Sequence, residues 1–66
     1  MKIQYKSFDG RYTHYLTTEV VLVEAHKGHE IYQDTDGWFF VQADDNWQYF
    51  GTKREAKRFI DGIMIE

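Results

Sequence analysis

The side chains that could act as nucleophiles, bases or metal ligands are scattered along the chain. There are three histidines, a single serine, eleven acidic residues and no cysteine. A serine nucleophile needs a base beside it, and nothing in the sequence places Ser7, the histidines and the carboxylates together. His26 and His29 flank a predicted turn and could in principle chelate a divalent ion, but exposed turn histidines are usually just solvated. We therefore expect no catalytic site, no metal site, no cofactor and no enzymatic activity.

Acidic residues crowd two short segments on either side of a tryptophan-containing stretch. The first segment resembles the opening of a calcium-binding loop, but it lacks the later ligands and the bidentate glutamate that such a loop needs. Aspartate and glycine are typical turn residues, so both segments are predicted to be turns. The carboxylates on these turns, predicted to form the rim of a binding surface, are Asp34, Asp36, Asp44 and Asp45.

Aromatic residues are the most abundant candidates for binding. They make up 18% of the chain, and tryptophan and tyrosine are enriched among the residues that dominate binding energy at protein interfaces. The alternative is that they simply fill the core of a small domain. The aromatic residues that the sequence places on a candidate contact surface, beside the acidic turns, are Trp38, Phe40, Trp47 and Tyr49.

Short strands joined by tight turns must position these residues. Residues 2–8 alternate polar and apolar side chains and precede Asp9-Gly10, a strong signal for a two-residue hairpin turn, with a return strand over residues 11–16. The β-branched residues of segment 19–26 favour a strand, although Thr18 and Gly28 could instead cap a short helix there. Further strands are expected over residues 29–33, 38–43 and 47–50.

Pairing across the predicted hairpins divides the side chains between two faces of the sheet. A two-residue loop at Thr35-Asp36 would set Tyr32 opposite Phe39 and Ile31 opposite Phe40. A second loop at Asp45-Asn46 completes the arrangement. One face then carries Tyr32, Phe39, Val41, Ala43 and Phe50, and the other carries Ile31, Trp38, Phe40, Trp47 and Tyr49.

The last quarter of the chain predicts a helix over residues 53–61. Thr52 and Glu55 have the spacing of a capping box, and Gly62 is a natural stop. The apolar residues at helical spacing are Ala56, Phe59, Ile60 and Ile63. We assign this helix to the sheet face with Phe39, and expect the opposite face to be covered by the first hairpin and the valine-rich segment, or to stay partly open.

The chain therefore predicts a single α+β domain over residues 1–66, an antiparallel β-sheet of four to six short strands packed by one C-terminal α-helix. Its net charge of −3 disfavours nucleic acid, whose affinity comes largely from basic side chains. No apolar run is long enough for a signal peptide or a membrane span, so we expect a cytoplasmic monomer or homodimer without membrane contact. A protein partner is favoured.

Several local patterns lie within roughly residues 28–62, namely Gly37-Trp38, Phe50-Gly51-Thr52, Glu55-Ala56 and Phe59-Ile60-Asp61. Together they resemble the pattern of small phage and prophage orphan proteins, in which a β-meander precedes a capped helix. This resemblance implies a compact accessory protein that binds and modulates host or phage machinery.

Two functions remain open from the sequence. The first is a small non-catalytic protein-binding module, such as a phage-encoded inhibitor of a host protein, that uses the aromatic patch and its acidic rim. The second is a nucleic-acid-binding module, in which the sheet aromatics stack on bases. The basic residues of the predicted helix that would then hold the backbone are Lys53, Arg54, Lys57 and Arg58.

Overall fold

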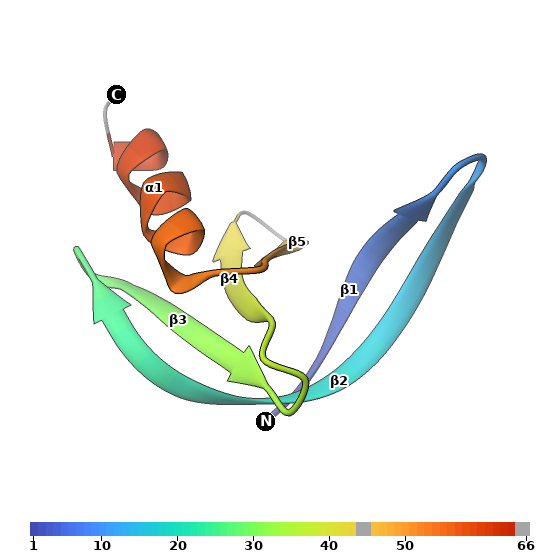
Figure 1. Ribbon diagram of the computed structural model, residues 1–66, viewed down its shortest axis with the longest axis horizontal. Helices are drawn as coiled ribbons and strands as arrows, with labels where there is room; N and C mark the ends of the chain where they lie inside the picture. The colour runs from blue at the N-terminus through green and yellow to red at the C-terminus, as the bar shows by residue number, and fades with distance from the viewer. Residues whose placement is uncertain (44–45, 65–66) are drawn as a thin grey trace.

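The computed structural model describes residues 1–43 and 46–64, and it confirms the predicted α+β class. One sheet of five antiparallel strands, in the order β1-β2-β3-β4-β5, is followed by a single helix (Figure 1). The long first hairpin reaches away from the helix in this view. The elements are β1 (Lys2–Asp9), β2 (Tyr12–His26), β3 (His29–Asp34), β4 (Phe39–Ala43), β5 (Asn46–Phe50) and α1 (Lys53–Met64).

The first hairpin turns one residue later than predicted. Asp9 pairs with Tyr12, so the two-residue loop is Gly10-Arg11. Only Gly10 has a positive φ, 61°, which suits a turn that needs glycine at its first central position rather than at both. The shift moves the pairing by two residues in total, so each side chain stays on the face that was expected.

Strand β2 is much longer than the short strands expected from the sequence. It runs without interruption for 15 residues, which confirms the strand prediction for segment 19–26 and rules out the alternative helix. Gly28, the residue that could have ended that helix, instead shares a tight turn with Lys27, and both have positive φ. This turn joins β2 to β3 because His26 pairs with His29.

The predicted pairing between β3 and β4 was wrong by one residue. Tyr32 lies opposite Phe40, not Phe39. The connection is a three-residue loop in which Gly37 has a φ of 94°, and the Asp34 amide donates to the Trp38 carbonyl at 3.0 Å. A one-residue slip in register moves a strand's side chains to the other face. Consequently Tyr32 and Ile31 exchange the faces predicted for them.

A β-bulge in β2 reverses the faces to which the side chains in the second half of the strand point. The regular pairing is interrupted between Leu22, opposite Tyr32, and Glu24, opposite Ile31. The extra residue, Val23, reverses the alternation of side chains. As a result, Glu24 and His26 point to the face that α1 covers, where they meet Lys53, Lys57 and Asp61.

Each face of the sheet has its own apolar cluster. The helix packs on the face with Phe39, as predicted, and the second cluster lies on the opposite face beneath β1. Cluster one contains Ile31, Val41, Ala56 and Ile60, with Phe39, Phe50 and Phe59 against it. Cluster two contains Ile3, Val20 and Phe40, with Tyr5, Tyr32 and Trp47 against it.

The helix begins where the sequence predicts and ends later. The Thr52 hydroxyl accepts a hydrogen bond from the Glu55 amide at 3.1 Å, which satisfies one of the free amides of the first turn. The helix continues past Gly62 to Met64, so the predicted stop at Gly62 was wrong. Ala56 and Ile60 are fully buried, whereas Ile63 is 40% exposed.

Candidate functional site

The four aromatic residues predicted to form a contact surface do not all reach solvent. Trp38 and Tyr49 are 46% and 39% exposed, but Phe40 is only 1% exposed and belongs to the core. Trp47 is half-buried and sets its ring edge-on to Tyr32 at a centroid distance of 5.5 Å. The expectation that Phe40 is accessible was therefore wrong, and the exposed pair is Trp38 and Tyr49.

These two residues line a shallow hollow of about 280 Å³, here called the aromatic groove. Tyr5 and Ser7 of β1 form its other side, and Phe40 forms part of its lining. The sheet curls so far that β1 approaches β5, and the rings of Tyr5 and Tyr49 lie 5.5 Å apart at 63°. Trp38 meets Tyr49 at 5.7 Å and 83°.

The sequence did not indicate that Tyr5 and Ser7 would belong to this site. They come from the other end of the chain, and no short-range pattern reports the approach of β1 to β5. The available signal was the alternation in residues 2–8, which places Ile3, Tyr5 and Ser7 on one face of β1. The burial of Ile3 beside Phe40 then brings Tyr5 to the groove.

One of the two predicted acidic turns lies beside the aromatic groove. Asp34 Oδ1 accepts hydrogen bonds from the amides of Asp36 at 3.0 Å and Trp38 at 2.9 Å. Both carboxylates act on the groove electrostatically. The pKa of Tyr5 is raised above its ordinary value, first by burial and then by charge repulsion from Asp34, from Tyr49 in its ionised form, and from Asp36. Asp44 and Asp45 lie outside the described residues.

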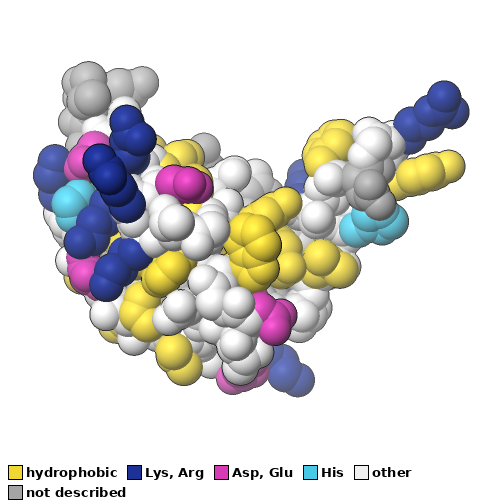
Figure 2. All heavy atoms as spheres, in the orientation of Figure 1, with side chains coloured by type: hydrophobic (Ala, Val, Ile, Leu, Met, Phe, Trp, Pro, Cys, Tyr) yellow, Lys and Arg dark blue, Asp and Glu magenta, His cyan; other side chains and the backbone are white. Residues whose placement is uncertain are grey.

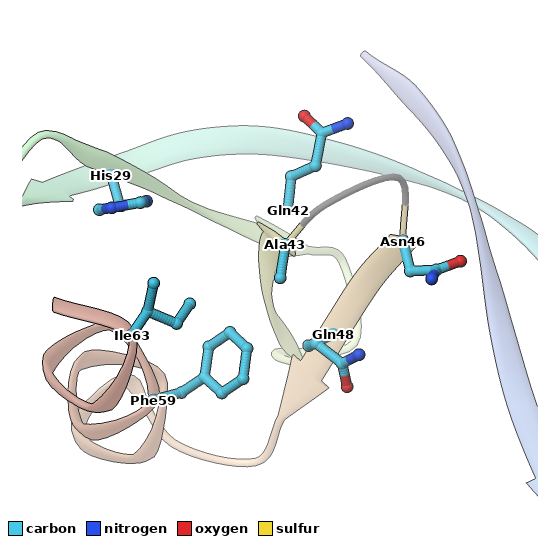
Figure 3. A pocket seen from close by; sticks show the side chains of 7 residues that line it. All are labelled: His29, Gln42, Ala43, Asn46, Gln48, Phe59 and Ile63. Atoms are coloured by element: carbon cyan, nitrogen blue, oxygen red, sulfur yellow. The ribbon is translucent and has the colours of Figure 1, made fainter. Parts of the chain in front are cut away.

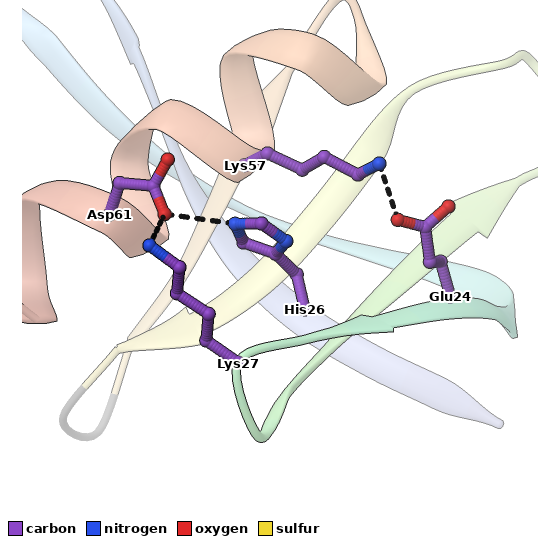
Figure 4. Close-up of polar contacts among 5 residues, drawn as sticks. All are labelled: Glu24, His26, Lys27, Lys57 and Asp61. Carbon is purple, nitrogen blue, oxygen red and sulfur yellow. Dashed lines mark hydrogen bonds and ion pairs between the residues drawn. The ribbon is translucent and has the colours of Figure 1, made fainter.

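The basic residues of α1 lie on the other side of the sheet from the aromatic groove. Figure 2 shows basic side chains gathered over the helix, interspersed with acidic ones. Lys53 Nζ lies 3.2 Å from one carboxylate oxygen of Glu24. Lys57 Nζ binds the other oxygen of the same carboxylate (Figure 4). Hydrogen bonds from Lys57 and then Lys53 hold the pKa of Glu24 below its ordinary value. Half of the helix's basic cluster is thus engaged within the domain.

The turn between β2 and β3, which His26 and His29 flank, forms a second contact with the helix. His26 Nε2 lies 2.9 Å from Asp61 Oδ1, and Lys27 Nζ lies 2.8 Å from the same oxygen (Figure 4). Lys27 first, and His26 second, lower the pKa of the Asp61 carboxyl. His26 therefore packs the β2-β3 turn against α1. Within residues 1–43 and 46–64, no group of three or more histidine and carboxylate side chains is arranged to hold a metal ion.

Another hollow, of about 480 Å³, lies between the end of α1 and the sheet (Figure 3). Phe59 and Ile63 point toward it from the helix, and His29 faces it from β3. Amide side chains of β5 flank it, while Gln42 points away. Its lining residues are His29, Gln42, Ala43, Asn46, Gln48, Phe59 and Ile63. The lining thus combines one imidazole with amides and apolar groups.

Comparison with known proteins gives no relative. No protein-family model, curated protein or solved structure matches the chain. The resemblance to small phage and prophage proteins consequently stays a prediction. The helix of the described chain is too short and too polar to cross a membrane.

Proposed function

We propose that this domain is a small protein-binding module, and that the exposed pair Trp38 and Tyr49, beside the acidic turn, is its contact surface. The observation that carries the proposal is that two large aromatic side chains remain open to solvent in a hollow next to Asp34 and Asp36. An aromatic centre with a polar or charged rim is the usual composition of a protein interface. Such aromatic residues commonly dominate its binding energy.

The resemblance in residues 28–62 extends this proposal to a modulator. A domain of 66 residues without a proposed catalytic constellation acts by occupying a surface of its partner. We therefore propose a phage-type accessory protein that inhibits or redirects a host protein in the cytoplasm, acting as a monomer or homodimer.

The competing function is binding of single-stranded nucleic acid. Its support is the exposure of Trp38 and Tyr49 together with Arg54 and Arg58 on the helix. Such binding normally combines stacking aromatics with a basic groove along the same path. Here the aromatic groove and α1 lie on opposite faces of the sheet, and the net charge is −3. These features favour a protein partner.

Affinity capture from cell lysate, with and without nuclease, tests the protein-binding proposal. The tagged domain should retain one protein in amounts close to its own after nuclease treatment, and Trp38→Ala should lose it. Tyr15→Ala is the matched control, because Tyr15 is an exposed aromatic whose strand partner is Lys6 rather than a groove residue. Loss of capture on nuclease treatment, or equal loss in both variants, would contradict the proposal.

Titration with single-stranded oligonucleotides at low salt tests the competing function. The proposal expects no saturable binding in the micromolar range by the wild-type domain. Nucleic-acid binding would instead be saturable, would weaken steeply with salt, and would disappear when Arg54 and Arg58 are changed to glutamate.

A further inference from the structure

The aromatic groove is lined by rings whose geometry bears on the kind of ligand that it can take. Three of its rings come from different strands or turns and stand at steep angles to one another. Tyr5 and Tyr49 meet at 63°, and Trp38 and Tyr49 meet at 83°. Steeply inclined rings do not offer one flat surface for a nucleobase, but they can surround a compact group from several sides. Aromatic rings arranged in this way attract ammonium and guanidinium groups through their electron-rich faces.

The charges beside the groove favour the same class of ligand. Asp34 and Asp36 lie close enough to raise the pKa of Tyr5 by charge repulsion, after the larger effect of burial. Carboxylates and phosphates would be repelled by this negative potential, whereas a cation would be attracted. The nearby carboxylates and the aromatic faces therefore both favour a cationic ligand.

The turn geometry fixes one of these carboxylates in place. Asp34 Oδ1 accepts two backbone hydrogen bonds, so the side chain has little freedom to turn away. In the described part of the chain Oδ2 has no hydrogen-bonding partner, which leaves this oxygen for a ligand. A charge-assisted hydrogen bond from a guanidinium or ammonium group is stronger than one between neutral groups.

We infer that the aromatic groove receives a basic side chain, arginine or lysine, from a segment of the partner protein. This inference rests on the proposed function and specifies the chemistry of the partner. The volume of about 280 Å³ suits one long side chain rather than a folded element. The apolar stem of the side chain packs on Trp38, and the charged end faces Tyr49 and the acidic turn.

Fluorescence titration of a Trp47→Phe variant tests this inference, because Trp38 is then the single tryptophan. The probe is an acetylated and amidated glycine-arginine repeat peptide, and its matched control replaces each arginine by citrulline, which is neutral and nearly the same shape. We expect a saturable change in Trp38 emission with the arginine peptide and about tenfold weaker binding of the citrulline peptide. A lysine repeat should also bind in preference to its neutral control.

Charge variants show whether the acidic turn takes part. Asp34→Asn and Asp36→Asn together should weaken binding of the arginine peptide severalfold and reduce its salt dependence. Glu55→Gln removes one negative charge from the other side of the sheet and should leave the affinity unchanged. Equal effects of these charge variants would overturn the inference.

Two further results would overturn the assignment to a basic side chain. One is equal binding of the arginine and citrulline peptides, or no saturable response to either at millimolar concentration. The other is binding of free choline as tight as that of the arginine peptide, which would indicate a small quaternary amine as the ligand. If these results appear while capture of a protein still depends on Trp38, the cation inference fails and the proposed function stands. If Trp38-dependent capture itself is absent, the proposed function fails.

Discussion

Asp34 and Trp38 are joined by two hydrogen bonds that run in opposite directions across the β3-β4 turn. The Asp34 amide donates to the Trp38 carbonyl at 3.0 Å, and Asp34 Oδ1 accepts from the Trp38 amide at 2.9 Å. The acidic rim and the exposed aromatic residue are thus parts of one rigid turn. The Asp34 carboxylate thus holds the backbone of Trp38 in place, while the Trp38 side chain is 46% exposed.

This relationship predicts different effects for two changes at Asp34. Asparagine keeps an oxygen that can accept both amide hydrogens, whereas alanine removes it. Asp34→Ala should lower the free energy of unfolding by about 1–2 kcal/mol, the net value of two partly exposed hydrogen bonds. Asp34→Asn should change it by less than about half of that. Urea denaturation measures both, and equal losses would show that the side-chain oxygen does not stabilise the turn.

A side chain at the glycine of the same turn should lower the stability of the domain. Gly37 has a φ of 94°, and an added Cβ would contact no atom within 4 Å, so the cost of Gly37→Ala is purely conformational, about 1–2 kcal/mol. Gly62 is a matched control because it lies inside α1 with no positive φ and open space around it. Gly62→Ala should therefore stabilise the domain by about 0.5–1 kcal/mol. Thermal unfolding of both variants should show melting temperatures that move in opposite directions.

Much of the fold could be predicted from local sequence signals. The predictions that were wrong have specific physical causes. The helix start at Lys53 and the turn at Gly28 were predictable because their caps and glycines act over a few residues. The exchange of Ile31 and Tyr32 between faces was not, because it depends on whether Gly37 belongs to the loop. The sequence Thr35-Asp36-Gly37 is compatible both with the predicted two-residue loop and with the observed three-residue loop.

The candidate site was predicted only in part for a different reason. Trp38 and Tyr49 are exposed as a contact surface requires, but Phe40 is buried by Ile3 and Val20. That burial depends on the curl of the whole sheet, which brings together residues far apart in the chain. The contribution of Tyr5 to the aromatic groove was missed for the same reason, because short-range sequence patterns do not indicate how strongly the sheet curls.

Substitutions at Phe40 and Trp38 should have different effects, one mainly on stability and the other mainly on binding. They lie two residues apart on one face, yet Phe40 is 1% exposed and Trp38 is 46% exposed. Phe40→Ala should cost about 3–5 kcal/mol through the cavity it leaves, which is most of the stability of a small domain. Trp38→Ala should cost less than about 1 kcal/mol while abolishing partner binding. Similar losses of stability in chemical denaturation would contradict the assignment of Trp38 to the surface.

The ion pairs between β2 and α1 predict weakening in acid. The pKa of Glu24 and that of Asp61 are lowered in the folded protein, so their contribution is present above the unfolded values near pH ~4 and is lost as the pH falls through the lowered values. Both carboxylates are partly exposed, so the effect is modest and weakens with salt.

The control for this pH dependence is Glu24→Gln. This variant should be less stable than the wild type at neutral pH, and the difference should shrink as the pH falls through the lowered pKa of Glu24, because Glu24 then becomes protonated in the folded as well as the unfolded state. Denaturation curves of both proteins at several pH values measure this difference in the free energy of unfolding. A difference that stays constant across this range would show that the Glu24 charge is not what stabilises the contact with α1.

The most direct test of the central claim is to map the contact surface on the domain itself. Backbone and indole NMR spectra of the isotopically labelled domain would be compared before and after addition of the captured protein. The account predicts that the largest changes fall on Trp38, Tyr49, Tyr5 and the Asp36 turn, with α1 little affected. Changes confined to the outer face of α1 around Arg54 and Arg58, with the Trp38 indole signal unmoved, would contradict it.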